Sequence, residues 1–220
     1  MISVAIDGPA GAGKSSISRK VSGELGFIYV DTGALYRSIA YTLNAKGITT
    51  EEIDKIEATL KETRIDIKFI DGEQHVMVND QDVSSEIRTA EISMLSSAFS
   101  ALPIVREYLL GLQRRKPQEN NVIMDGRDIG TVVLPNATVK IFLTADPEDR
   151  AKRRYDEMIE KGMTANYDDV LEDIKKRDYN DSHRPVAPLK PAEDSIVVNT
   201  TGNTFEQSVE QLANIIKSNI

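Results

Sequence analysis

The sequence predicts an α/β fold in which helices cover a five-stranded parallel sheet. Five short runs are almost entirely apolar and rich in β-branched residues, which is typical of strands buried on both faces. They are residues 2–6, 27–30, 122–124, 139–143 and 195–198. Helical segments lie between or after these runs, as they do where parallel strands are joined by crossover connections.

Helix signals separate the predicted strands. A helix over 14–25 follows a glycine-rich turn, a second begins at Asp146 and Pro147, and the last begins at Thr204. Aspartate and threonine are common N-cap residues, and proline suits the first helical turn. Residues 183–191 contain three prolines, so we expect an ordered loop before the last strand.

Residues 64–83 interrupt the α/β pattern. Apolar and polar residues alternate on both sides of an Asp-Gly turn signal at 71–72, which predicts an antiparallel hairpin. We assign the hairpin and the helix after it to a small inserted lobe over 63–97. The core domain then comprises residues 1–62 and 98–220.

Composition narrows the classes of function. The 220 residues carry a net charge of −8, which argues against a surface built for nucleic acid. There is no cysteine, so disulfides and thiolate chemistry are excluded and we expect a cytoplasmic protein. No membrane segment is expected either. Arginines that converge in an acidic protein indicate a small anionic ligand.

Residues 8–15 match the phosphate-binding pattern G-x-x-x-x-G-K-[ST] in full, after a strand and before a helix. Backbone N–H groups of such a loop and the start of the helix bind phosphates. Lys14 would span the β- and γ-phosphates, Ser15 would bind Mg²⁺, and Asp125, after the third strand, would order a water of the same ion. We assign ATP binding to Gly8, Pro9, Ala10, Gly11, Ala12, Gly13, Lys14, Ser15 and Ser16.

Charged segments elsewhere indicate a second site. Residues 31–37 follow the second strand, where Thr32 is expected to cap a helix and Arg37 to lie one turn further on. Residues 125–130 place an Arg-Asp pair at the carboxyl edge of the sheet, where ligands of α/β proteins bind. A plain helix cap and a solvated salt bridge remain the alternatives.

Two later helices add further basic residues. Arg150, Arg153 and Arg154 have the spacing of one helix face and could form a mobile clamp on phosphate, although a solvated face is the alternative. Arg177 and Asp181 are an i, i+4 pair before the proline-rich loop. Such a pair either stabilises a surface helix or is placed for a ligand.

Four segments together resemble bacterial cytidylate kinases: the phosphate-binding loop, Asp-Thr-Gly-Ala-Leu-Tyr-Arg, Asp-Gly-Arg-Asp-Ile-Gly-Thr-Val-Val, and Arg-Asp-x-x-Asp-x-x-Arg-x-Val-Ala-Pro-Leu. The resemblance runs from end to end. It implies a P-loop kinase fold with a nucleoside-monophosphate-binding lobe at 63–97 and a helical lid at about 147–168. It also implies Mg²⁺-dependent transfer of the ATP γ-phosphate to CMP or dCMP, a step of pyrimidine nucleotide metabolism that gives CDP or dCDP and ADP.

The resemblance also implies residue roles. The cytosine ring would be read by Thr32, Arg106 and Asp128, the pentose held by Ser97, Arg177 and Asp181, and the acceptor phosphate bound by Arg37, Arg127 and Arg184. The family often has serine at the position of Thr32, which keeps the hydroxyl. We add Tyr36 to the acceptor set, Arg153 to the ATP set, and Lys14, Arg127, Arg150 and Arg154 as catalytic residues.

Alternatives of other classes are weaker. A GTPase would need an Asn-Lys-x-Asp element, which is missing, and a nucleic-acid-stimulated ATPase would need a basic track. Adenylate, thymidylate or another small-molecule kinase is the remaining alternative. We expect a monomer whose partners are CMP, dCMP and ATP.

Overall fold

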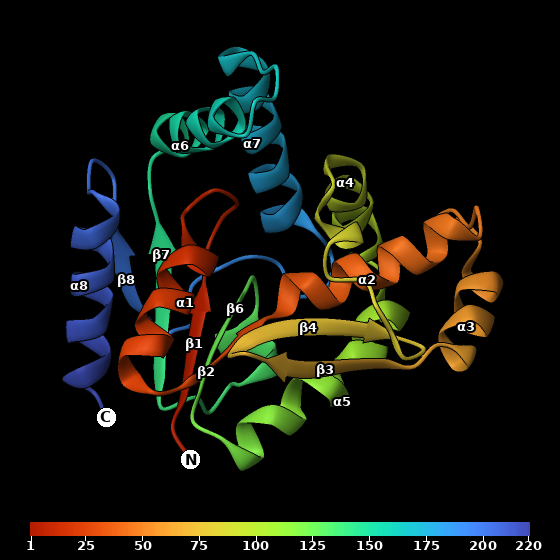
Figure 1. Ribbon diagram of the computed structural model, residues 1–220, viewed down its shortest axis with the longest axis horizontal. Coiled ribbons are helices and arrows are strands. Elements are labelled where there is room, and N and C mark those ends of the chain that lie inside the picture. Colours follow the sequence, from red (N-terminus) through yellow and green to blue (C-terminus); the bar gives the residue numbers. More distant parts are fainter. The chain divides into compact units, whose positions relative to one another are not determined.

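The computed structural model describes all of residues 1–220, which fall into two compact units (Figure 1). The first unit comprises residues 1–29 and 120–220, and the second comprises residues 30–119. The predicted lobe at 63–97 lies within the second unit, and its boundaries remain a prediction.

A five-stranded sheet has the strand order β2-β6-β1-β7-β8. Its strands are β1 (Ser3–Asp7), β2 (Ile28–Asp31), β6 (Val122–Gly126), β7 (Val139–Thr144) and β8 (Ile196–Asn199). β1 is central and pairs in parallel with β6 and β7, and β7 pairs in parallel with β8. All five predicted strands are therefore confirmed, with ends shifted by one or two residues.

The first unit contains four α-helices: α1 (Lys14–Leu25), α6 (Pro147–Glu160), α7 (Tyr167–His183) and α8 (Phe205–Lys217). Apolar side chains of α1 and α8 share one buried cluster with β1, β6, β7 and β8. A smaller cluster joins α6 to α7, which lie beside each other in Figure 1. A short π-helical turn, η2 (Ile129–Val133), follows β6.

The second unit contains four α-helices: α2 (Thr32–Ala45), α3 (Ile53–Glu62), α4 (Ala90–Phe99) and α5 (Pro103–Glu119). The predicted hairpin is confirmed as β3 (Ile65–Ile70) and β4 (Glu73–Val78), joined by a turn with positive φ at Asp71 and Gly72. A two-residue strand, β5 (Gln81–Asp82), extends it to three strands and was not predicted. The 3₁₀ turn η1 (Glu86–Arg88) leads from this sheet to α4.

Of the two predicted N-cap residues Asp146 and Thr204, one makes a capping hydrogen bond through its side chain. Thr204 caps α8 with a reciprocal capping box to Gln207, as its residue type favours. Asp146 stands at the predicted N-cap of α6, but its side chain accepts no capping hydrogen bond. None of the helices combines the length and the apolar character needed to cross a bilayer.

Candidate active site

The phosphate-binding loop joins β1 to α1 at the carboxyl edge of the sheet. Gly8 has a φ of +152°, and a Cβ there would lie 1.9 Å from the carbonyl oxygen of Leu143, so no side chain fits. Gly13, the N-cap of α1, is in the left-handed region, which glycine adopts without strain. The glycines let the backbone curl around the start of α1, where N–H groups attract anions.

Lys14 is buried inside this loop, and its Nζ donates a 2.7 Å hydrogen bond to the carbonyl oxygen of Pro9. Burial, together with the nearby Arg127 cation, lowers the pKa of Lys14 to about 7. The carboxylates of Asp125 and Asp181 oppose this shift. Phosphate oxygens in the loop would favour the charged form of the amine.

Asp125 connects the loop to the end of β6. Its two oxygens accept hydrogen bonds from the Ser15 hydroxyl, at 2.8 Å, and from the buried Tyr29 hydroxyl, at 2.9 Å. No group of three or more histidine, cysteine or acidic residues is gathered for a metal. Mg²⁺ needs few protein ligands when phosphate oxygens and water complete its octahedron, so the Ser15–Asp125 pair fits such an ion.

The end of β6 and the end of α7 contribute two oppositely charged pairs. Arg127 donates a 2.8 Å hydrogen bond from Nε to Asp181, and Arg184 Nη2 lies 3.6 Å from Asp128 Oδ1. Burial would raise the pKa of Asp181, but the Arg127 cation outweighs it and the pKa is lowered. Asp181 therefore bonds across the fold to β6, beyond the helical pairing with Arg177 that the sequence suggested.

The three arginines of α6 lie in different surroundings. Arg150 is buried and donates to the carbonyl oxygens of Ala145 and Ala10 and to Asp178 on α7, each within 2.8 Å. Arg150 therefore connects α6 to the phosphate-binding loop and to α7.

Arg153 donates to the carbonyl oxygen of Thr200 at 2.6 Å and forms an ion pair with Asp149. Arg154 is 47% exposed and pairs with Glu157. The single basic face that the spacing predicted is thus divided between buried and exposed contacts.

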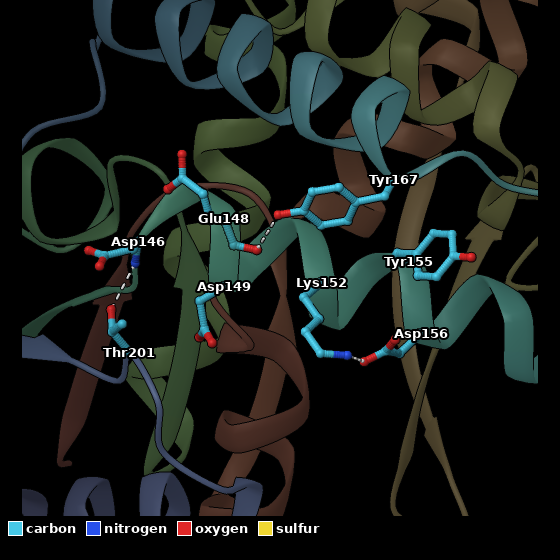
Figure 2. A pocket seen from close by; sticks show the side chains of 8 residues that line it. All are labelled: Asp146, Glu148, Asp149, Lys152, Tyr155, Asp156, Tyr167 and Thr201. Atoms are coloured by element: carbon cyan, nitrogen blue, oxygen red, sulfur yellow. Dashed lines mark hydrogen bonds and ion pairs between the residues drawn. The ribbon is translucent and has the colours of Figure 1, made fainter.

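Other residues of α6 line a cavity of about 650 Å³ with Tyr167 at the start of α7 and with Thr201 (Figure 2). Four carboxylates and one lysine reach it: Asp146, Glu148, Asp149, Asp156 and Lys152. Lys152 is paired with Asp156, and the Tyr167 hydroxyl donates to the backbone of Glu148 (Figure 2). This cavity contains no predicted site residue, and its excess of carboxylates does not suit phosphate.

In the second unit, Asp31 fixes the start of α2. Its side chain accepts a hydrogen bond from the backbone of Ala34 and pairs with Arg37 at 2.8 Å. Asp31 is thus the N-cap, and the prediction that Thr32 caps this helix was wrong because Thr32 is already its first residue and is buried. The Nε atom of Arg37 is buried and has no hydrogen-bond partner. Gly33 leaves room for this pair, since a Cβ there would lie 3.1–3.2 Å from both side chains.

The other predicted residues of this unit lie on α2, α4 and α5. Arg106 on α5 is buried, donates to the carbonyl oxygen of Ser100 at 3.1 Å and lies 5.5 Å from the Tyr36 ring on α2. Ser97, half-buried on α4, accepts through its carbonyl oxygen from the hydroxyl of Ser100. A single loop residue, Ser100, therefore contacts both predicted residues.

Sequence reasoning missed two supporting residues. Tyr29 holds Asp125, and Gln74 on β4 makes two hydrogen bonds to the backbone of Asp31, at 2.9 and 3.1 Å. A tyrosine in an apolar strand run is a weak signal for such a role. Gln74 gave no signal, because its position opposite Asp31 depends on how the hairpin folds against α2.

Comparisons with known proteins agree over almost the whole length. The sequence model of the family described as "Cytidylate kinase" matches residues 4–218. A cytidylate kinase of Leuconostoc mesenteroides subsp. mesenteroides is 46% identical over 217 residues, which is 99% of this chain and 97% of the relative. A cytidylate kinase of Streptococcus equi subsp. equi is 48% identical over 210 residues, 95% of this chain and 93% of the relative.

One solved structure supports the fold alone. An uncharacterized protein from Eubacterium ventriosum ATCC 27560 aligns over 99% of both chains with a TM-score of 0.55 and 12% identity. Identity this low says nothing about substrates.

Proposed function

Because the chain belongs to the cytidylate kinase family, we propose that it transfers the γ-phosphate of ATP to CMP or dCMP with the help of Mg²⁺. It is a nucleoside monophosphate kinase with a P-loop kinase fold, and its products are CDP or dCDP and ADP. The observation that carries this conclusion is the family match over residues 4–218, which includes both the phosphate-binding loop and the acceptor segments.

The ATP side is assigned to the loop and to α6. Residues 8–16 bind the phosphates, Lys14 neutralises charge between the β- and γ-phosphates, and Arg153 contacts ATP beside Thr200. Ser15 and Asp125 hold Mg²⁺, which neutralises phosphate charge when bound. The 2.8 Å contact between these two side chains supports this assignment.

Arg150 and Arg154 are assigned to the transferring phosphate. Arg150 is the better supported of the two, because one of its nitrogens already contacts the loop at Ala10. Arg154 is exposed and would have to exchange Glu157 for phosphate when the lid residues close.

Acceptor choice is assigned to Asp128, with Thr32 and Arg106 as further contacts to the base. A carboxylate accepts a hydrogen bond from the exocyclic amine of cytosine, whereas uracil presents a carbonyl oxygen there. Asp128 is buried, so a base that turns a carbonyl oxygen toward this carboxylate would place two acceptors together with no hydrogen between them. UMP is therefore rejected in favour of CMP.

The acceptor phosphate and pentose are assigned to arginines and their carboxylate partners. Arg37, Arg127 and Arg184 bind the phosphate, and the unpartnered Nε of Arg37 supports its part in this. Ser97, Arg177 and Asp181 hold the pentose, with Tyr36 beside them.

No general base is required. The second pKa of a phosphate monoester is about 6, so the acceptor is mostly a dianion at pH 7. Rate enhancement comes from in-line positioning and charge neutralisation, with water excluded so that ATP is not hydrolysed. We expect a cytoplasmic monomer that acts on small molecules only.

The test is an ADP-release assay with Mg-ATP and a panel of CMP, dCMP, UMP, AMP, dTMP and no acceptor. Fast turnover with CMP or dCMP and little without an acceptor is expected. Asp128→Asn should lower the CMP:UMP ratio of kcat/KM at least about tenfold, or 1.4 kcal/mol, whereas the exposed control Asp173→Asn should not. A clear preference for a non-cytosine nucleotide would overturn the assignment.

A further inference from the structure

A second buried carboxylate, Asp7, lies at the end of β1 and has no part in the chemistry assigned above. The three residues before it, Val4, Ala5 and Ile6, are completely buried, and Asp7 itself is 4% exposed. A buried charge is costly unless it is paired or hydrogen-bonded, so its partners indicate what it stabilises.

Both oxygens of Asp7 bind consecutive backbone amides of η2. Oδ1 accepts from the N–H of Ile129 and Oδ2 from the N–H of Gly130, each at 2.7 Å. The first N–H groups of a helical turn have no partner within the turn. One carboxylate satisfies two of them with charge-assisted hydrogen bonds, which are stronger than neutral ones.

These two bonds fix the residue that precedes η2, which is Asp128. Its backbone has a φ of −148° and a ψ of 27°, and its carbonyl oxygen accepts from Val132 and Val133 to form the π-helical turn. On its N-terminal side, Gly126 is held in the sheet opposite Asp7 itself. Asp7 therefore holds the chain on both sides of Asp128. Its backbone lies opposite Gly126 in the sheet, and its side chain accepts from the N–H groups of Ile129 and Gly130.

The surroundings of Asp7 leave little freedom. A Cβ on Gly130 would lie 3.4 Å from Asp7 Oδ2 and 3.3 Å from the side chain of Lys140, whose amine pairs with Asp194. The charged groups that act on the carboxylate are Asp128 before η2 and Lys14 on α1. Burial raises the pKa of Asp7 to about 6, and the two amide donors limit this rise.

We propose that Asp7 is a positioning residue for base selection: it holds the 128–130 backbone so that the Asp128 carboxylate meets the amine of cytosine. This inference rests on the proposed role of Asp128. Since Asp7 directly precedes Gly8, the side chain that positions the acceptor-reading residue belongs to the strand that carries the ATP-binding loop.

The test compares Asp7→Asn with wild type in the CMP:UMP ratio of kcat/KM. Asparagine keeps the shape but turns an N–H donor toward one of the two backbone donors, so the 128–130 segment must shift. The ratio should fall at least about tenfold, mainly through a higher KM for CMP. The KM for ATP should change less than the KM for CMP, because Asp7 acts on the ATP side only through its charge near Lys14, whereas it bonds directly to the 129–130 backbone.

Controls separate positioning from simple loss of stability. Leu212→Ala removes a fully buried side chain of α8, far from any assigned residue in sequence, and should lower stability without changing the CMP:UMP ratio. Asp7→Glu keeps the charge but is one methylene longer, so it should also lower the ratio by displacing the amides. It provides a second folded variant if Asp7→Asn does not fold.

The outcomes distinguish this inference from the proposed function. If Asp128→Asn leaves the ratio unchanged, the assigned role of Asp128 fails, and the inference fails with it. If Asp128→Asn lowers the ratio but a folded Asp7 variant keeps the wild-type ratio, only the positioning role is overturned. A fall in both supports both.

Discussion

Two regions of this molecule are dense in close charged contacts, but they differ in burial. At the carboxyl edge of the parallel sheet, Asp7 and Lys14 are 4% and 5% exposed. In the three-stranded sheet, His75 and Asp82 are 2.6 Å apart with side chains 29% and 41% exposed. The pair formed by Arg64 and Asp80 is more exposed still.

The two regions differ in how deeply their charged groups are buried, and not in the distances between those groups. Desolvation is the largest cause that moves the pKa of Asp7 up and that of Lys14 down, toward neutrality in both cases. In the three-stranded sheet, hydrogen bonds from Ser84 and then His75 lower the pKa of Asp82 to about 2, which favours its charged form. The charges of the first region are held at a cost that a ligand can relieve, whereas those of the second are already satisfied by their neighbours and water.

The largest difference should come from two glycines with positive φ, Gly8 and Gly72. Gly8→Ala would put a methyl group 1.9 Å from the carbonyl oxygen of Leu143, whereas a Cβ at Gly72 meets nothing within 4 Å. Gly8→Ala should prevent folding or lower the free energy of unfolding by more than about 4 kcal/mol. Gly72→Ala should cost only the left-handed backbone strain, about 1–2 kcal/mol. Urea unfolding of both variants measures this, and similar losses would show that the clash at Gly8 is relieved.

The second largest effect should be the loss of activity in Lys14→Met. Lys14→Met removes the only amine inside the phosphate-binding loop and should lower kcat at least about a hundredfold, as expected for loss of a preorganised phosphate contact. Lys20→Met is the matched control, because Lys20 lies on the same helix but is exposed and pairs with Glu24. The ADP-release assay with CMP compares the two. A Lys14→Met enzyme within tenfold of wild type would remove Lys14 from catalysis.

The sequence predicts much of the first region and little of what holds it together. The apolar runs, the glycine loop and the helix at 14–25 are local patterns, so the strands, the loop and α1 follow from residue types near one another. The bonds from Asp7 to Ile129 and from Arg127 to Asp181 join residues more than 50 positions apart. No local pattern contains them, because they arise only when β1, β6 and α7 meet at one edge of the sheet.

The second region shows the same limit on a smaller scale. Alternating residues and an Asp-Gly turn predict β3 and β4, but β5 is two residues long and too short for a pattern. The cap of α2 was placed one residue late, since Asp31 and Thr32 are both good capping types and only the backbone decides between them. The two bonds from Gln74 to Asp31 likewise depend on tertiary packing.

The buried charges should also leave a signature in the pH dependence of stability without nucleotide. Burial raises the pKa of Asp7 from 3.8 in the unfolded chain to about 6, so the native state binds more protons between these values and stability falls as pH rises through them. Burial and the Arg127 cation lower the pKa of Lys14 from 10.5 in the unfolded chain to about 7, so the unfolded state binds more protons between these values and stability rises with pH.

The nucleotide-free protein should therefore show a stability minimum between pH 6 and 7, measured by urea unfolding across pH 4–10. Lys14→Met should remove up to about 1.4 kcal/mol per pH unit of the rise above pH 7, whereas Lys20→Met should keep it. An unchanged rise in Lys14→Met would mean that another group causes it.

The smallest effect should come from Asp82, a carboxylate of the exposed three-stranded sheet that has three close partners. Asp82 contacts His75 at 2.6 Å and both the hydroxyl and the N–H of Ser84, at 2.5 and 3.0 Å. Because water reaches these groups, Asp82→Asn should change the free energy of unfolding at pH 7 by less than about 1 kcal/mol. Since the pKa of Asp82 is lowered, the stability that its carboxylate contributes is present above pH 3.8 and is lost as pH falls toward about 2.

The matched comparison is Asp181→Asn, which removes the carboxylate that accepts from Arg127. It should lower the free energy of unfolding by more, about 1.5–3 kcal/mol. Urea unfolding of the two variants at pH 7 compares these losses of stability. A larger loss for Asp82→Asn than for Asp181→Asn would mean that contact geometry outweighs burial in this protein.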